Sequence, residues 1–187
     1  MLRLFIAVDL PAELRDQVAG LMEGVHNARW VNPGQLHVTL HFVGDTPEDE
    51  VAGLRDRLEG VKQDCFRLQL RGAGVFPEGQ SRIKPPKVLW LGMEPATPMV
   101  RLKQNVHAAL GINPMGKDQA FSPHLTLARF KSLPDGTLAD FLDRNREFET
   151  RTWTVTCFHL YQSTLRQQGA VHNVLASYPL APPARVE

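Results

Sequence analysis

The stretches His37-Val38-Thr39-Leu40 and His124-Leu125-Thr126-Leu127 repeat one pattern, in which a histidine and a threonine alternate with apolar residues. Successive side chains of a β-strand point to opposite faces, so this alternation predicts two strands. Each strand would present an imidazole and a hydroxyl side by side and bury its two apolar residues. Two such strands facing each other would surround one cleft with two histidines and two threonines.

This set of side chains suits in-line substitution at phosphorus. One histidine takes a proton, the other gives one, and hydroxyls hold the phosphoryl oxygens. A single histidine on a strand is more often structural than catalytic, but the repetition of the whole tetrad favours a functional pair. We therefore predict His37, Thr39, His124 and Thr126 as the catalytic residues.

Composition limits the class of protein. The 187 residues fit one domain or two small lobes that share a core, and we expect a single domain over residues 1–187. A content of 43% hydrophobic and 22% charged residues is typical of a soluble globular protein. The net charge of +1 argues against a protein that coats a nucleic-acid duplex but allows a local basic pocket. Two cysteines without a CxxC motif form no disulfide framework.

The N-terminal apolar stretch is short, because Asp9 interrupts it and Pro11 follows. Such a stretch does not make a signal peptide, and no apolar run approaches the roughly 20 residues of a membrane span. We therefore expect a cytoplasmic monomer with no membrane attachment and no obligatory protein partner.

Apolar periodicity predicts alternating strands and helices along the chain. Helical spacing predicts helices over residues 12–26, 47–61, 99–110 and 138–144. Alternation predicts strands over residues 2–8, 37–43, 66–75, 88–93, 124–130, 153–161 and 171–178. Each half contains a tetrad strand followed by a helix, which indicates a duplicated α+β fold. A single mixed sheet with helices outside is the less specific alternative.

Metal binding is the main chemical alternative. His37 and His41 have the spacing of a zinc-binding pair on a helix. In a strand, four residues span roughly 13 Å, which is too far for two ligands with zinc bonds of about 2.0 Å. We therefore expect neither a metal nor another cofactor, and we place His41 at the rim of the cleft at most. No nucleophile motif and no phosphate-binding glycine loop is present.

Several basic and aromatic residues are candidates for substrate binding. Arg129 would clamp a phosphate if a bulge or the strand end turned it back to the face of His124. Trp30, beside a turn, and Tyr161, at a strand end, are candidates for stacking a base, and Phe42 is a third, although core packing is its simpler role. Solvent exposure is the simpler role of four further basic residues: Arg82, Lys84, Lys87 and Lys131.

The chain resembles the 2H phosphoesterases, which are named for two His-x-Thr/Ser-x motifs. Among them it is similar to the bacterial and archaeal RNA 2′,3′-cyclic phosphodiesterases, also called 2′-5′ RNA ligases. The resemblance covers nearly the whole chain. It rests on the segments RLFIAVDLP (Arg3–Pro11), WVNPGQLHVTLHFVG (Trp30–Gly44), PKVLWLG (Pro86–Gly92), FSPHLTLAR (Phe121–Arg129) and LYQSTL (Leu160–Leu165). One position departs from the family: relatives often carry a tyrosine where this chain has His172.

The resemblance implies a bilobal α+β fold with a pseudo-twofold axis, antiparallel-rich sheets lining a central cleft and helices outside. It also implies metal-independent opening of an RNA 2′,3′-cyclic phosphate to a 2′-phosphomonoester, and a reversible side activity that joins tRNA-half ends through a 2′-5′ bond. We assign His124 as the base and His37 as the acid, although the symmetric motif does not order them.

Two other functions remain open. A module that binds RNA ends or nucleotides without chemistry would use the same cleft, but phosphate binding alone favours arginine and lysine over paired histidines. A phosphodiesterase for small cyclic nucleotides or 2′-5′ oligonucleotides is also compatible with the nearly neutral net charge.

Overall fold

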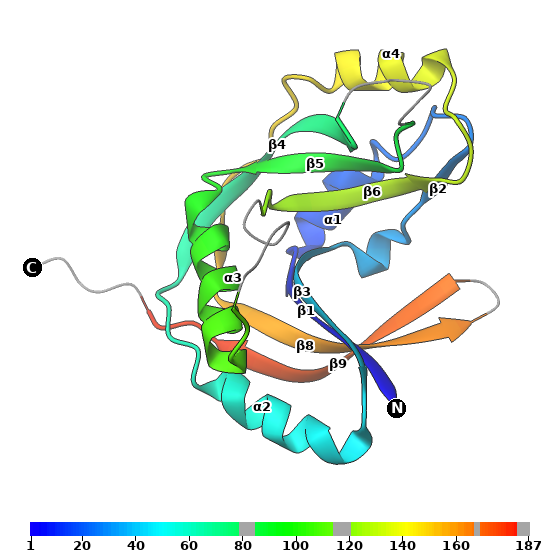
Figure 1. Cartoon of the computed structure of the whole chain (residues 1–187). Helices are drawn as coiled ribbons and strands as arrows, with labels where there is room; N and C mark the ends of the chain where they lie inside the picture. Colours follow the sequence, from blue (N-terminus) through cyan, green and yellow to red (C-terminus); the bar gives the residue numbers. More distant parts are fainter. Residues whose placement is uncertain (79–84, 114–120, 167–168, 183–187) are drawn as a thin grey trace, which may run out of the picture.

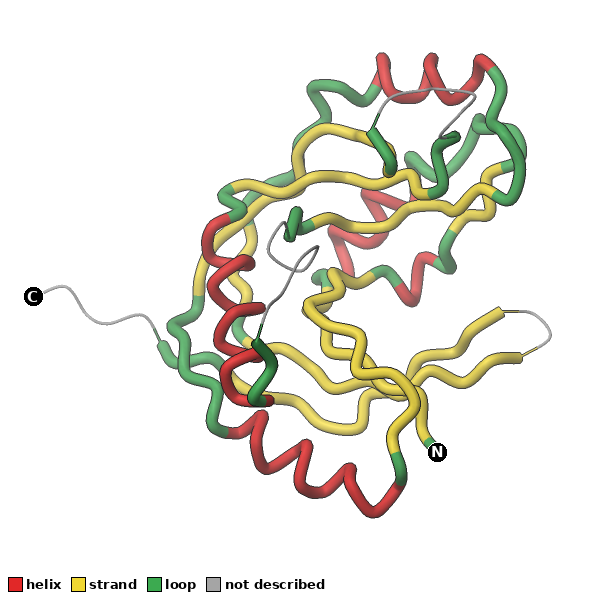
Figure 2. Tube along the Cα trace, in the orientation of Figure 1, coloured by secondary structure: helices red, strands yellow, loops and turns green. Residues whose placement is uncertain are grey.

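The computed structural model describes residues 1–78, 85–113, 121–166 and 169–182, and this part of the chain forms two antiparallel β-sheets with helices around them (Figures 1 and 2). One sheet has the strand order β3-β1-β8-β9 and the other β2-β6-β5-β4-β7. The strands are β1 (Leu2–Asp9), β2 (Ala28–Trp30), β3 (His37–Thr46), β4 (Phe66–Phe76), β5 (Val88–Glu94), β6 (His124–Phe130), β7 (Trp153–Val155), β8 (Cys157–Arg166) and β9 (Gly169–Pro179). The α+β class is confirmed, and the single mixed sheet is wrong.

The helices show the duplication that the tetrads indicate. They are α1 (Ala12–Ala19), α2 (Val51–Glu59), α3 (Thr97–Leu110) and α4 (Gly136–Arg144), with short 3-10 turns η1 (Pro33–Gln35) and η2 (Glu48–Glu50). The order β1-α1-β3-α2 in the first half recurs as β5-α3-β6-α4 in the second, with β2 and the 3-10 turns inserted in the first. Helix α3 of the second unit contacts strand β3 and helix α2 of the first, so the two units interlock.

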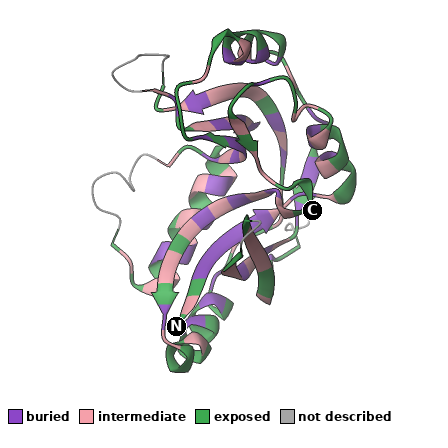
Figure 3. Cartoon of the chain, turned by 90° about the vertical axis from the view of Figure 1, so that its right-hand side faces the viewer, coloured by how far each residue is buried: buried purple, intermediate pink, exposed green. Residues whose placement is uncertain are grey.

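Burial follows the alternation of the tetrads. Val38, Leu40, Leu125 and Leu127 are at most 2% exposed, whereas the histidines and threonines between them are half-buried. Most buried apolar residues of both sheets belong to one core cluster, and Phe5, Ala7 and Tyr161 form a second, smaller one. Figure 3 shows this core as buried segments along the strands, while the helices carry exposed residues on their outer sides. No helix in the described ranges is long and apolar enough to cross a membrane.

Several elements differ from the sequence prediction. The helix predicted over residues 47–61 is the 3-10 turn η2 followed by the shorter helix α2. Helix α1 ends at Ala19 rather than at residue 26, and Gly24, with a left-handed φ of 73°, is incompatible with a helix that continues to residue 26. The predicted strand over residues 153–161 is two strands, because the chain passes from one sheet to the other at Thr156. The three residues of β2, which pair with β6, are too few to give a periodic signal.

Candidate active site

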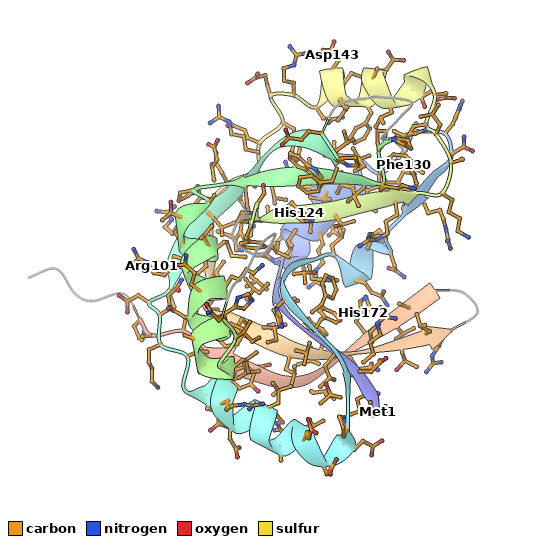
Figure 4. The ribbon with its side chains drawn as sticks, viewed as in Figure 1. Met1, Arg101, His124, Phe130, Asp143 and His172 are labelled. Atoms are coloured by element: carbon orange, nitrogen blue, oxygen red, sulfur yellow. The ribbon has the colours of Figure 1, made fainter. Side chains whose placement is uncertain are left out.

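The two tetrads meet where strand β3 contacts strand β6 between the sheets. His37, Thr39 and Thr126 line one cavity of about 530 Å³, together with Arg129. His124 lies at the beginning of β6 (Figure 4) and is not among the residues that line this cavity. The Arg129 charge nevertheless acts on both imidazoles and lowers the pKa of each, after the larger effect of burial. The structure therefore brings both tetrads around one cationic group.

Both histidines are held in the same way. The Nδ1 atom of His37 donates to the backbone carbonyl of Gln35 at 2.7 Å, and Nδ1 of His124 donates to that of Ser122 at 2.8 Å. A carbonyl oxygen only accepts hydrogen bonds, so Nδ1 carries the proton in each ring. This fixes one tautomer and leaves Nε2 of each neutral imidazole as the atom that exchanges protons.

Burial shapes the electrostatics of the two imidazoles. Loss of hydration lowers the pKa of His37 and of His124 below 6.5. The carbonyl bonds from Nδ1 oppose this effect in both rings, and Asp9 opposes it at His37 alone. The two sites are thus alike in geometry but different in charge environment.

Each tetrad ends in a β-bulge at its leucine. In the pairing of β1 with β3, Ile6 lies opposite His41 and Ala7 opposite Thr39, so Leu40 is the extra residue. In the pairing of β5 with β6, Leu127 is extra in the same way, between Thr126 and Ala128. An extra residue reverses the alternation of side chains beyond it.

The two bulges turn equivalent residues into the cavity. Phe42 and Arg129 each follow a tetrad threonine by three positions, and strict alternation would point both away from the threonines. Instead both line the cavity, and Phe42 is 66% exposed. The bulge required for Arg129 to face the threonines is therefore present, and core packing of Phe42 is wrong.

The model of the 2′-5′ RNA ligase superfamily matches residues 10–167 of the chain. The chain belongs to this superfamily. The 2H phosphoesterase resemblance of the sequence is thereby confirmed, as is a fold of two antiparallel sheets.

Relatives agree with this membership. The RNA 2′,3′-cyclic phosphodiesterase of Archaeoglobus fulgidus is 30% identical over 177 residues, which cover 93% of this chain and 98% of the relative. The protein of that name from Thermus thermophilus is 35% identical over 196 residues, covering 96% and 90%. Among solved structures, TT0787 of Thermus thermophilus superposes with a TM-score of 0.76 at 30% identity over 97% of this chain and 99% of that one. LigT of E. coli complexed with NADP⁺ gives 0.71 at 26% identity, over 96% and 98%.

Trp30 and Tyr161, two candidates for stacking a base, do not line the larger cavity. The Trp30 ring packs against Phe141 of α4, with ring centres 5.9 Å apart, and does not line the cavity. Tyr161 is 8% exposed and stacks on Phe5, with ring centres 5.0 Å apart. Burial of Tyr161 against Phe5 does not favour base stacking on its ring, whereas Trp30 is partly exposed and base stacking on it stays a prediction. Tyr161 lines a smaller cavity of about 200 Å³ beside His37.

The remaining candidates lie away from the cavity or outside the described residues. Lys87 and Lys131 are exposed and do not line it, and Arg82 and Lys84 lie outside the described residues. His41 is not at the rim of the cleft: its Nδ1 lies 3.1 Å from Nε2 of His107 on α3. The described ranges contain no group of three or more His, Cys, Asp and Glu residues arranged to hold a metal ion.

Sequence reasoning did not place two residues, Asp9 and His172, beside His37, although the family resemblance had marked His172 as a departure. The ring of His172, on β9 (Figure 4), stands perpendicular to that of His37 with centres 5.4 Å apart, and it lines both cavities. Asp9 lines the smaller one. The signal for Asp9 was its period-two spacing from Phe5 along β1, which puts both residues on the face that carries His37. His172 gave no such signal, because its place depends on the pairing of β8 with β9.

Proposed function

We propose that the chain opens RNA 2′,3′-cyclic phosphates to 2′-phosphomonoesters with His37 and His124 as a general acid–base pair. The observation that carries the proposal is the matched pair of Nδ1 bonds to backbone carbonyls, which leaves both Nε2 atoms available for proton transfer. The relatives share the name RNA 2′,3′-cyclic phosphodiesterase, which supports this substrate class. General acid–base catalysis by this pair requires that one imidazole is neutral and the other is protonated.

The proposed reaction is an in-line displacement. The neutral imidazole takes a proton from water through Nε2 as the water oxygen bonds to phosphorus. The bond from phosphorus to the 3′ oxygen breaks on the opposite side, and the imidazolium gives its Nε2 proton to that oxygen. The products are a 2′-phosphomonoester and a 3′-hydroxyl, and the two histidines have exchanged protonation states.

The other cavity residues would act on the charge that develops at phosphorus. The hydroxyls of Thr39 and Thr126 would donate to the non-bridging oxygens, and Arg129 would neutralise them. No step of this reaction requires a metal ion. The exposed ring of Phe42 would cover the terminal base.

The same acid–base pair would also support ligation. If the 5′-hydroxyl of a second RNA replaces water, the product is a 2′-5′ phosphodiester and a free 3′-hydroxyl. The reaction is reversible because a diester is exchanged for a diester. The joining of tRNA-half ends is therefore proposed as a side activity. The single-domain organisation, the cytoplasmic location and the monomeric state stay predictions.

The test uses an RNA oligonucleotide that ends in a 2′,3′-cyclic phosphate, incubated in EDTA with the intact chain, His37→Ala and His124→Ala. We expect a 2′-phosphate product from the intact chain, and a loss of about 10²–10⁴-fold in turnover from each variant. A 3′-phosphate product, or near-normal activity of either variant, would contradict the mechanism. A parallel reaction with a 2′,3′-cyclic mononucleotide distinguishes RNA ends from small cyclic nucleotides. Binding without turnover would indicate a binding module.

A further inference from the structure

The side chain of Asp9 faces His37 from the neighbouring strand. The two residues are direct partners in the pairing of β1 with β3. Directly opposed residues of an antiparallel pair share one face, with Cβ atoms about 4.5–5.5 Å apart. Both residues also line the same cavity of about 200 Å³. The carboxylate therefore lies close enough to act on the imidazole.

We infer that Asp9 is a positioning residue that keeps a proton on His37, the histidine assigned above as the acid of the reaction. This inference rests on the two-histidine function proposed above. It goes beyond that function because it gives a role to a carboxylate that the proposed reaction does not use.

Neighbouring side chains hold the Asp9 carboxylate in place. The Tyr161 hydroxyl donates to Oδ1 of Asp9 at 2.5 Å. Burial, together with this bond, raises the pKa of the tyrosine, so its hydroxyl remains a donor at any physiological pH. His159 lies on the other side, with Nε2 3.9 Å from Oδ2, and its Nδ1 bonds to the Ser177 hydroxyl at 2.8 Å. The hydrogen bond from the Tyr161 hydroxyl thus fixes the position of the Asp9 carboxylate. Because the phenol is neutral, the negative charge of Asp9 remains available to act on His37.

The equivalent position opposite His124 holds no side chain. In the pairing of β5 with β6, the partner of His124 is Gly92. A Cβ atom at Gly92 would lie 2.8 Å from the backbone oxygen of Arg71, a distance that real Cβ atoms essentially never show. The backbone of β4 therefore excludes a carboxylate there, and the inequivalence of the two histidines is built into the fold.

The negative charge of Asp9 opposes the effect of the other charged groups around His37. Arg129 faces it from β6, His172 from β9 and Arg15 from α1, and each of these is cationic or becomes so on protonation. Among the described residues that line the two cavities, Asp9 is the one carboxylate. Without it, no anionic side chain on these walls would favour an imidazolium at His37 before the substrate binds.

The direct test substitutes sulfur for the 3′ oxygen of the cyclic phosphate. A thiolate leaves without being protonated, so this substrate does not need the acid. We expect His37→Ala, which loses about 10²–10⁴-fold on the oxygen substrate, to come within about tenfold of the wild type on the sulfur substrate. His124→Ala should remain slow on both substrates, because the attacking water still needs its base. Rescue of His124→Ala instead of His37→Ala would reverse the order and overturn the inference.

Asp9→Asn tests the positioning role itself. The amide keeps an oxygen for the Tyr161 hydroxyl but removes the charge. We expect a loss of turnover on the oxygen substrate that shrinks on the sulfur substrate. In an NMR titration of the ring signals, the pKa of His37 should fall while that of His124 stays unchanged. Asp56→Asn, on the exposed side of α2, is the matched control and should change neither reading.

These readings separate the inference from the proposed function. Unshifted titration of His37 in Asp9→Asn would overturn the role of Asp9 even if both histidines prove essential. Full activity of both alanine variants would instead overturn the two-histidine function, whatever the titration shows.

Discussion

Phe42 and Arg129 are equivalent residues of the two tetrad strands, and each enters the cavity because a bulged leucine precedes it by two positions. One unit of the duplicated fold thus contributes an exposed aromatic ring and the other contributes a guanidinium. The same kind of β-bulge thus directs an apolar side chain into one side of the site and a charged side chain into the other.

The guanidinium should act on phosphate binding and on both histidines. We expect Arg129→Gln to lower kcat/KM by roughly 10–100-fold, because a charge-assisted hydrogen bond contributes about 1.5–3 kcal/mol. Arg129→Lys should restore part of this loss, since it keeps the charge but not the paired N–H groups. Removal of the charge should also raise the pKa of His37 and His124, which a pH profile of kcat/KM detects as a shift to higher pH. An unchanged profile would contradict the placement of Arg129 near both imidazoles.

The Phe42 ring should matter for substrate affinity and not for folding. It is 66% exposed, so Phe42→Ala removes little buried surface and should leave the melting temperature nearly unchanged. Stacking of one base on an aromatic ring contributes about 1–3 kcal/mol, so loss of the ring should raise KM for an RNA end by roughly 5–150-fold.

Trp30 provides the contrast to Phe42. Its ring packs on Phe141, so Trp30→Ala should lower the free energy of unfolding by roughly 1–3 kcal/mol and leave KM nearly unchanged. Thermal denaturation and steady-state kinetics of both variants measure the two effects. A reversed pattern, with Trp30 affecting KM and Phe42 affecting stability, would refute the assignment of the two aromatic side chains.

The threonine hydroxyls should be interchangeable with serine hydroxyls but not with methyl groups. We expect Thr39→Ala and Thr126→Ala each to reduce kcat by roughly tenfold or more, since each removes a donor to the charge that builds at phosphorus. Thr39→Ser and Thr126→Ser are the matched controls, which keep the hydroxyl and should retain most activity. If the double alanine variant is as fast as the wild type, the hydroxyls take no part in catalysis.

The pH dependence follows from the buried imidazoles. Burial puts the pKa of both His37 and His124 below 6.5 in the free protein. Since one must be neutral and one protonated, kcat/KM should be greatest at a pH below 6.5 and decline towards neutrality as the second proton is lost. Bound phosphate favours the imidazolium, so the optimum of kcat should lie at higher pH than that of kcat/KM. Initial rates between pH 4.5 and about 8.5, in buffers of constant ionic strength, measure both curves. An optimum of kcat/KM above pH 7 would mean that burial does not control these groups.

Much of the fold could be predicted because its signals are local. Val38, Leu40, Leu125 and Leu127 indicated two buried strand faces through their period of two, and burial confirms all four. Strand pairing was outside the reach of periodicity. The three residues of β2 and the change of sheet at Thr156 depend on partners that lie far away in the chain.

The sequence by itself determined the residue types of the candidate site and the faces on which they lie, because side-chain direction in a strand depends only on neighbouring residues. The tertiary structure decided which residues became neighbours. Bulges at Leu40 and Leu127 admitted Phe42 and Arg129, and packing on Phe141 removed Trp30. Strand register set Asp9 against His37 and Gly92 against His124. Register and bulges result from hydrogen bonding between distant segments, and for this reason they distinguish two histidines that the sequence presents as equal.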